Sequence, residues 1–185
     1  MKNLIKKNLN GKIILLLFAL TNIVYAIMLL VTIPKVMQYS GGMKLLDMLP
    51  TGYNHDYVRA LLDTLGSQGR DIYLHVQLPV DMIYPGLFGI SYCLVMAYFL
   101  NKLNKLDSYL FYFCLIPIFS GIFDYSENIG IISMLNNYPD NSILLTQVTS
   151  VFSVLKSSFT TFYFISLLLL LIALGKQKLR LLIAK

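Results

Sequence analysis

Four long, mainly apolar stretches organise the chain, over residues 12–34, 81–101, 108–135 and 142–175. Each has about the 20 residues that a helix needs to cross a hydrocarbon layer of about 30 Å. The last two are longer than a bilayer requires, and the polar segment NNYPDNS at 136–142 between them is typical of a turn. The pattern predicts one all-α integral membrane domain over residues 1–185, a four-transmembrane-helix bundle with a long hairpin of the third and fourth spans.

The segment 35–80 is the only sizeable one between spans. In DYVRALLDTLG we expect a short helix that begins at an Asp56 cap and ends at Gly66, and a second that begins at Ser67. Both are expected to be interfacial helices in the first external loop. Pro79 and Pro85 flank the start of the second span and predict a kink there. We find no internal repeat along the chain.

Composition supports the membrane class. Hydrophobic residues make up 57% of the chain and charged residues 13%, against about 25% charged residues in a typical soluble domain. Lipid is therefore the first expected partner. The first apolar stretch continues through IMLLVTIP after the cleavage-like VYA at 24–26, which favours a retained membrane helix over a signal peptide.

The basic residues predict how the chain is oriented. Ten of the fifteen fall on the two termini and on the loop between the second and third spans: Lys2, Lys6, Lys7, Lys12, Lys102, Lys105, Lys176, Lys178, Arg180 and Lys185. The positive-inside rule then places both termini in the cytoplasm, and we expect a multi-pass protein of the bacterial inner membrane. The net charge of +6 is explained by topology, so we expect no nucleic-acid partner.

The third span carries the candidate chemistry in GIFDYSENIGI. Asp124, Glu127 and Asn128 share one helix face by their i, i+3, i+4 spacing. Lipid disfavours such a face, so it is expected to turn inward. Counting residues from turns near Asn104 and Pro139 places this face level with residues of the second and fourth spans. The candidate ligand-binding residues are therefore Asp81, Tyr84, Asp124, Glu127, Asn128 and Lys156, with Arg70 and Gln77 as contacts from the outer segment.

Two interpretations of this layer remain open at the level of sequence. In the first, Asp124 pairs with Lys156 in a structural network, with Glu127 and Asn128 at the wet interface. In the second, the layer forms an outward-facing pocket near the outer membrane interface that binds a small molecule or lipid headgroup. The pocket is the favoured interpretation. A membrane-embedded enzyme that uses paired carboxylates is one alternative, and a structural or accessory subunit of a membrane complex is another. A transport path through so few spans requires a homo-oligomer or a partner membrane subunit.

Several chemistries lack their motifs. There is no G-x-S-x-G, no C-x-x-C around Cys93 or Cys114, and no metal-binding spacing for His55 and His75. We therefore expect no metal and no cofactor, and assign no catalytic residue. Four spans, internal termini and paired acids near the outer face resemble the topology of the bacterial lipoprotein signal peptidases. The motifs around that family's aspartates are absent here, so the resemblance carries over neither residues nor activity.

Overall fold

The computed structural model describes residues 2–183, and over that range it contains helices and turns but no strand. The chain is 83% helical. Four helical stretches are long and apolar enough to cross a membrane: Gly11–Met37, His55–Lys102, Tyr109–Asn136 and Ile143–Arg180. The all-helical class predicted from the sequence is confirmed, together with the number of such stretches.

The first stretch consists of α2 (Gly11–Ile27), the π-helical turn η1 (Met28–Thr32) and α3 (Ile33–Met37), and the short α1 (Lys2–Lys7) precedes it. The stretch ends at Met37 and not at Pro34 as predicted. A proline cannot donate an N–H, and its ring crowds the carbonyl four residues earlier. The wider turn, in which the Ile33 N–H bonds to the Met28 carbonyl, accommodates that ring within a continuous helix.

The second stretch begins with α4 (His55–Ile72), which the Asn54 side chain caps by accepting from the Tyr57 N–H at 2.8 Å. It continues through the π-helical turn η3 (Tyr73–Gln77), α5 (Leu78–Asp81) and α6 (Tyr84–Lys102). Gly66 breaks α4 as predicted, at φ 61°. The expected second interfacial helix is wrong as a separate element, because the chain after Gly66 runs directly into the second span. The predicted kink lies at Met82–Ile83, between Pro79 and Pro85.

The third stretch begins with the 3-10 helix η4 (Tyr109–Leu115), and α7 (Ile116–Asn136) follows it. The fourth is α8 (Ile143–Ile183), a single helix of 41 residues. It does not end at Gly175 as expected. One interior glycine costs a helix only about 1 kcal/mol, and the following KQKLRLLI consists of residues with good helix propensity.

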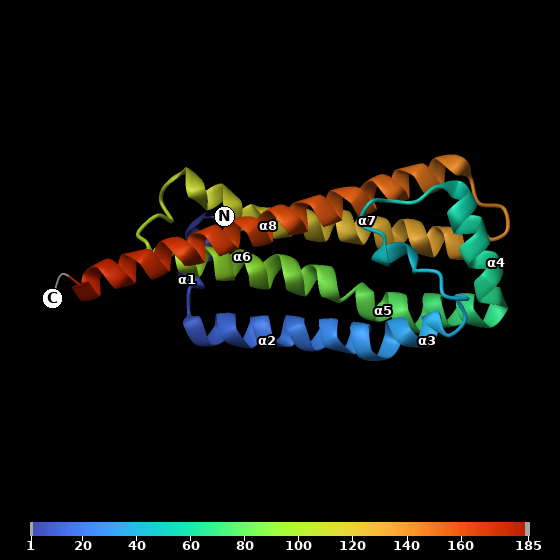
Figure 1. Cartoon of the computed structure of the whole chain (residues 1–185), viewed down its shortest axis with the longest axis horizontal. Helices are drawn as coiled ribbons and strands as arrows, with labels where there is room; N and C mark the ends of the chain where they lie inside the picture. Colours follow the sequence, from blue (N-terminus) through green and yellow to red (C-terminus); the bar gives the residue numbers. More distant parts are fainter. Residues whose placement is uncertain (1, 184–185) are drawn as a thin grey trace.

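Both termini lie at one end of the molecule, which we call the α1 end, and α4 crosses the opposite end, the α4 end (Figure 1). The connection between α6 and α7 also lies at the α1 end, where Lys2 and Lys6 each pair with Asp107 at 2.8 Å. The basic segments that the charge pattern assigned to one side therefore share one end of the fold.

Two hydrophobic clusters fill the interior. One lies toward the α1 end and includes Met96, Leu100 and Tyr163. The other lies toward the α4 end and includes Val36 and Leu65. Tyr84 packs against both clusters, so the predicted polar layer lies between them.

Glycines allow the second and third spans to approach closely, as their positions predicted. A Cβ atom at Gly121 would lie 2.7 Å from the Pro85 carbonyl oxygen, and one at Gly89 would lie 3.4 Å from that of Pro117. The contact between α6 and α7 is therefore one of backbone against backbone, and it holds Asp81 and Tyr84 near the acids of α7.

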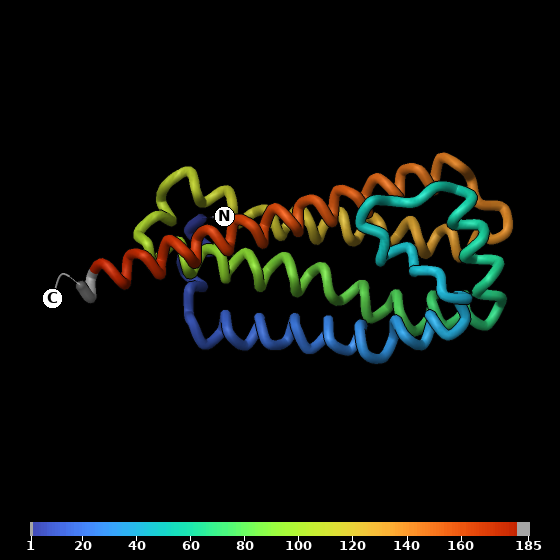
Figure 2. The backbone as a smooth tube through the Cα atoms, viewed as in Figure 1, coloured from blue at the N-terminus to red at the C-terminus, as the bar shows by residue number. Residues whose placement is uncertain are grey.

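The connection from α3 to α4, residues 38–54, folds back along the helices before it reaches α4 (Figure 2). It contains the 3-10 helix η2 (Leu46–Met48). The Tyr53 N–H donates to the Ser150 hydroxyl at 2.8 Å, and Gly52 crosses the same serine with φ +82°. These contacts bring Asp47, at the centre of the connection, to the level of Lys156.

Candidate functional site

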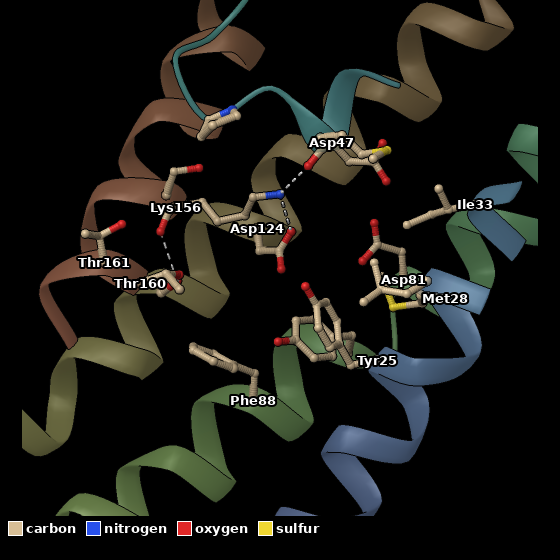
Figure 3. A pocket seen from close by; sticks show the side chains of 16 residues that line it. Tyr25, Met28, Ile33, Asp47, Asp81, Phe88, Asp124, Lys156, Thr160 and Thr161 are labelled. Carbon is tan, nitrogen blue, oxygen red and sulfur yellow. Dashed lines mark hydrogen bonds and ion pairs between the residues drawn. The ribbon is translucent and has the colours of Figure 1, made fainter. Parts of the chain in front are cut away.

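Lys156 on α8 is the centre of a closed ion-pair network with α7. Its Nζ lies 3.2 Å from an Asp124 carboxylate oxygen and also pairs with Glu127. The Ser153 hydroxyl donates to the other oxygen of Glu127. Nζ further contacts the main-chain oxygen of Asp47 at 3.5 Å (Figure 3). The predicted pair of Asp124 and Lys156 is therefore present, whereas Glu127 and Asn128, expected at a wet interface, are fully buried.

A pocket of about 430 Å³ lies beside this network. Four of the predicted residues line it together, which confirms the common level inferred from residue counting: Asp81, Tyr84, Asp124 and Lys156. The same layer thus contains both arrangements that the sequence left open, an ion-pair network and a pocket that shares its walls.

Asp81 differs from the other acids of the layer. Its side chain is only 3% exposed and lines the pocket, and in Figure 3 it lies beside Met28, apart from Lys156. Its carboxylate has no hydrogen-bond or ion-pair partner among the side chains of residues 2–180. An ionised carboxylate that is buried without a partner is strongly unfavourable, so Asp81 either stays protonated or pairs with a group from outside the chain.

Asp47 was not predicted, and it is held over the pocket. Its carboxylate accepts from the Tyr73 hydroxyl at 2.8 Å and from the Gln77 amide at 3.2 Å. Residue counting from the span turns gave no signal for it, because the position of Asp47 depends on how segment 38–54 folds back. Gln77, predicted as a ligand contact, instead anchors Asp47.

Aromatic rings form the wall of the pocket toward the α1 end. The rings of Tyr25 and Tyr84 stack with centroids 5.4 Å apart, and Tyr84 packs on Phe88 at 5.7 Å. All three residues line the pocket. An unpaired carboxylate and a set of aromatic faces therefore meet in one cavity.

Three further candidates lie outside the pocket lining. Glu127 is behind Lys156, and Asn128 is fully buried with no hydrogen bond to its amide from the described residues. Arg70 donates to the Leu62 carbonyl at 2.7 Å, where Gly66 ends the first half of α4, and its guanidinium lies 4.0 Å from the ring centroid of Tyr138. The structure therefore places Arg70 in the fold of the α4 end and away from the pocket.

Tyr53 borders the network from the folded-back connection. Burial, and next the negative charge of Glu127, raise the pKa of its hydroxyl. The phenol therefore remains neutral at physiological pH and adds no charge to the layer.

Two segments that meet beside the pocket match each other in sequence and conformation. MLLVTIPKV (residues 28–36) and YLHVQLPVD (residues 73–81) share Leu, Val and Pro at equivalent positions. Each contains a π-helical turn immediately before a proline-containing helix. Their equivalent polar residues join, because the Thr32 hydroxyl bonds to the Gln77 side chain. We call these two nine-residue segments the matched junctions.

No group of three or more His, Cys, Asp or Glu side chains is arranged to hold a metal ion within the described residues. The His55 ring nitrogen contacts the Thr146 hydroxyl at 3.2 Å, and His75 contacts Asp71 at 2.9 Å. Cys93 and Cys114 are free and buried. These side chains have packing or local hydrogen-bonding roles.

Comparison with known proteins gave no match: no family model, no curated protein and no solved structure is significantly similar to this chain. The function must therefore be argued from the site itself.

Proposed function

We propose that this chain is a multi-pass membrane protein whose pocket binds a small molecule or lipid headgroup near the outer membrane interface. The four apolar helical stretches support insertion. The basic residues gathered at the α1 end support a cytoplasmic location for both termini, which places the α4 end on the outer side.

The observation that carries this proposal is the unpartnered Asp81 in the wall of a pocket. A network built only for stability pairs its buried charges, as Lys156 does for Asp124 and Glu127. Asp81 is left facing a cavity of about 430 Å³, a volume within the range of about 300–1,000 Å³ that is common for ligand sites. A ligand would supply the partner that the protein does not.

The pocket has a lateral approach between α2 and α8. Tyr25 and Leu29 line it and are 43% and 42% exposed, and Thr161 on α8 lines it from an exposed position. The helix pairs α2–α6 and α7–α8 pack closely, whereas α2 and α8 do not form a packed pair. A headgroup entering from the outer leaflet would therefore reach Asp81 while its acyl chains remained in lipid.

One observation favours the enzyme alternative as a second candidate. Asp124 is paired with Lys156 while Asp81, in the same pocket, has no partner. Acid–base catalysis by two carboxylates requires such unequal environments. Under this alternative Asp81→Asn and Asp124→Asn abolish turnover equally, whereas under the binding proposal Asp81→Asn weakens ligand retention and no product is formed.

The decisive experiment is an experimental density map of the protein excised from its own membrane in polymer nanodiscs. We expect non-water density in the pocket. Thr161→Trp, which places an indole in the pocket without touching the ion pairs, should remove that density. Ile165→Trp, at an exposed position on the same helix outside the lining, is the matched control and should retain it. A wild-type pocket that holds only water would refute the binding proposal.

A further inference from the structure

We infer that the ligand of this pocket carries an organic ammonium group that binds at Asp81. The inference rests on the proposed function and deepens it by naming the chemistry that the site recognises. Three features of the pocket point to it: its charge, its aromatic wall and its lateral approach.

The charge of the site favours a cation. Asp47, Asp81 and Asp124 all line the pocket, and among the described residues Lys156 is the only basic one in the lining. That lysine is already shared between Asp124 and Glu127. The walls therefore carry more negative than positive groups, and an anion would meet Asp81 without a free base to bind it. A cationic group would complete the pairing of Asp81.

The donor set favours an organic cation over a metal ion. Calcium takes six to eight oxygen ligands, and the described residues contain no group of three or more His, Cys, Asp or Glu side chains arranged to hold a metal ion. The stacked rings of Tyr25 and Tyr84, with Phe88 beside them, instead line the same cavity as Asp81. A carboxylate together with aromatic faces is the environment that binds alkylammonium groups.

Two sources supply this chemistry, an aminophospholipid headgroup and a free amine in water. Because the pocket is approached between α2 and α8 beside exposed Leu29, the lipid source fits the geometry. The hydroxyls of Ser157 and Thr161 also line the pocket and are suited to donate to phosphate oxygens next to the ammonium group.

The test is native mass spectrometry of the purified protein with equimolar phosphatidylethanolamine and phosphatidylglycerol, which differ in the ammonium group. We expect wild-type protein to retain phosphatidylethanolamine at least about tenfold more strongly, since a charge-assisted hydrogen bond contributes that order of preference. Asp81→Asn should abolish the preference. Asp71→Asn, which removes an equal charge from an exposed residue, is the matched control and should preserve it.

A second pair of variants keeps the test independent of Asp81. Tyr84→Leu removes an aromatic face and should weaken retention several-fold, whereas Tyr84→Phe keeps the face and should have little effect. A parallel titration with soluble phosphoethanolamine distinguishes the sources. Stabilisation by the soluble amine without retention of the lipid would assign a free amine as the ligand.

Three results would overturn the inference: equal retention of both lipids without binding of the soluble amine, a preference that survives Asp81→Asn, or binding of neither probe. These results are distinct from failure of the proposed function. If the pocket is occupied and Thr161→Trp empties it, the binding site stands and only the ammonium chemistry is wrong. A pocket that holds only water would refute both the proposed binding function and the inference of an ammonium ligand.

Discussion

The matched junctions at residues 28–36 and 73–81 have the same local design and different roles. In both, the first, fifth, sixth and ninth residues are buried and the proline is exposed. The ninth position is Val36 in one junction, within the hydrophobic cluster of the α4 end, and Asp81 in the other, facing the pocket. The same succession of a π-helical turn and a proline-containing helix therefore supports packing in one junction and a candidate binding group in the other.

The difference follows from chain direction. Thr32 and Gln77 meet at one level, but α2 to α3 runs toward the α4 end and α5 to α6 runs away from it (Figure 1). Val36, four residues after Thr32, therefore lies in the apolar cluster, whereas Asp81, four residues after Gln77, lies in the polar layer. A short repeat thus gives two environments when its copies are antiparallel, and only one of them tolerates an acid.

Introducing an acid at the equivalent position of the first junction should have the largest effect on stability. Val36 is fully buried among apolar side chains, so Val36→Asp would bury a carboxylate with no partner. We expect a loss of more than about 4 kcal/mol of stability, or failure to accumulate folded protein. Thermal unfolding in detergent, followed by circular dichroism, measures it. Lys35→Asp changes the adjacent exposed residue and should unfold near the wild-type temperature. Equal stability of the two variants would refute the assignment of Val36 to an apolar core.

Removing the base that pairs the other acids should be nearly as damaging. Lys156→Met leaves Asp124 and Glu127 buried without their cation, which typically costs about 3–5 kcal/mol. The combined Lys156→Met, Asp124→Asn and Glu127→Gln variant should recover much of the loss, because the network then contains no unpaired charge. Lys44→Met, at an exposed position, serves as the control. Wild-type stability of Lys156→Met would show that the network is not structural.

Breaking the contact between the junctions should have an intermediate effect. Gln77→Leu removes the amide donor of Asp47 and the acceptor of the Thr32 hydroxyl. Leaving such buried groups unsatisfied costs about 1–3 kcal/mol. Thr32→Val removes only one of these contacts and should cost less. The two values are compared by thermal unfolding, and the reverse order would contradict the role of Gln77 as the anchor of Asp47.

Replacing the acid of the second junction by the valine found at the equivalent position of the first should leave stability unchanged or raise it by up to about 2 kcal/mol. Asp81→Val removes a buried carboxylate that has no protein partner, and the substituted junction matches Val36. Ligand retention should be lost at the same time, which is the usual cost of a stabilised binding site. Destabilisation similar to that of Lys156→Met would instead make Asp81 a structural member of the network.

The smallest effect is expected at the α1 end, far from both junctions. Hydrogen bonds from Lys2 and Lys6 lower the pKa of Asp107 to about 2. A lowered pKa in the folded state means that the contribution is present above about pH 4 and is lost as the pH falls toward 2. Amide exchange in α1 should increase over that interval. Asp107→Asn should reproduce the increase at neutral pH without changing global unfolding, because the pairs are exposed and screened by solvent.

The sequence was most informative about the regular helices. The long apolar runs identified the four helical stretches, and helix spacing placed Asp124 and Glu127 on one face. Counting residues along antiparallel spans brought Asp81, Tyr84 and Lys156 to the same level, and all three line the pocket with Asp124. Within a straight helix, height is proportional to residue number, which is why this inference from spacing succeeded.

The sequence was least informative where the backbone is irregular. Asp47 reaches the site on a connection that folds back along the helices, Arg70 turns to the α4 end, and two π-helical turns carry the chain past Pro34 and Pro79. Nothing in residue spacing gives the path of a loop or the side to which a long flexible side chain turns.

The sequence by itself thus determined an all-helical chain with four stretches able to cross a membrane and a polar layer within them, because periodicity and helix rise are properties of local sequence. Only the tertiary structure decided which acids are satisfied. Lys156 can pair with a limited set of neighbours, and the packing of α7 on α8 gives it Asp124 and Glu127 while the opposite wall leaves Asp81 facing the pocket.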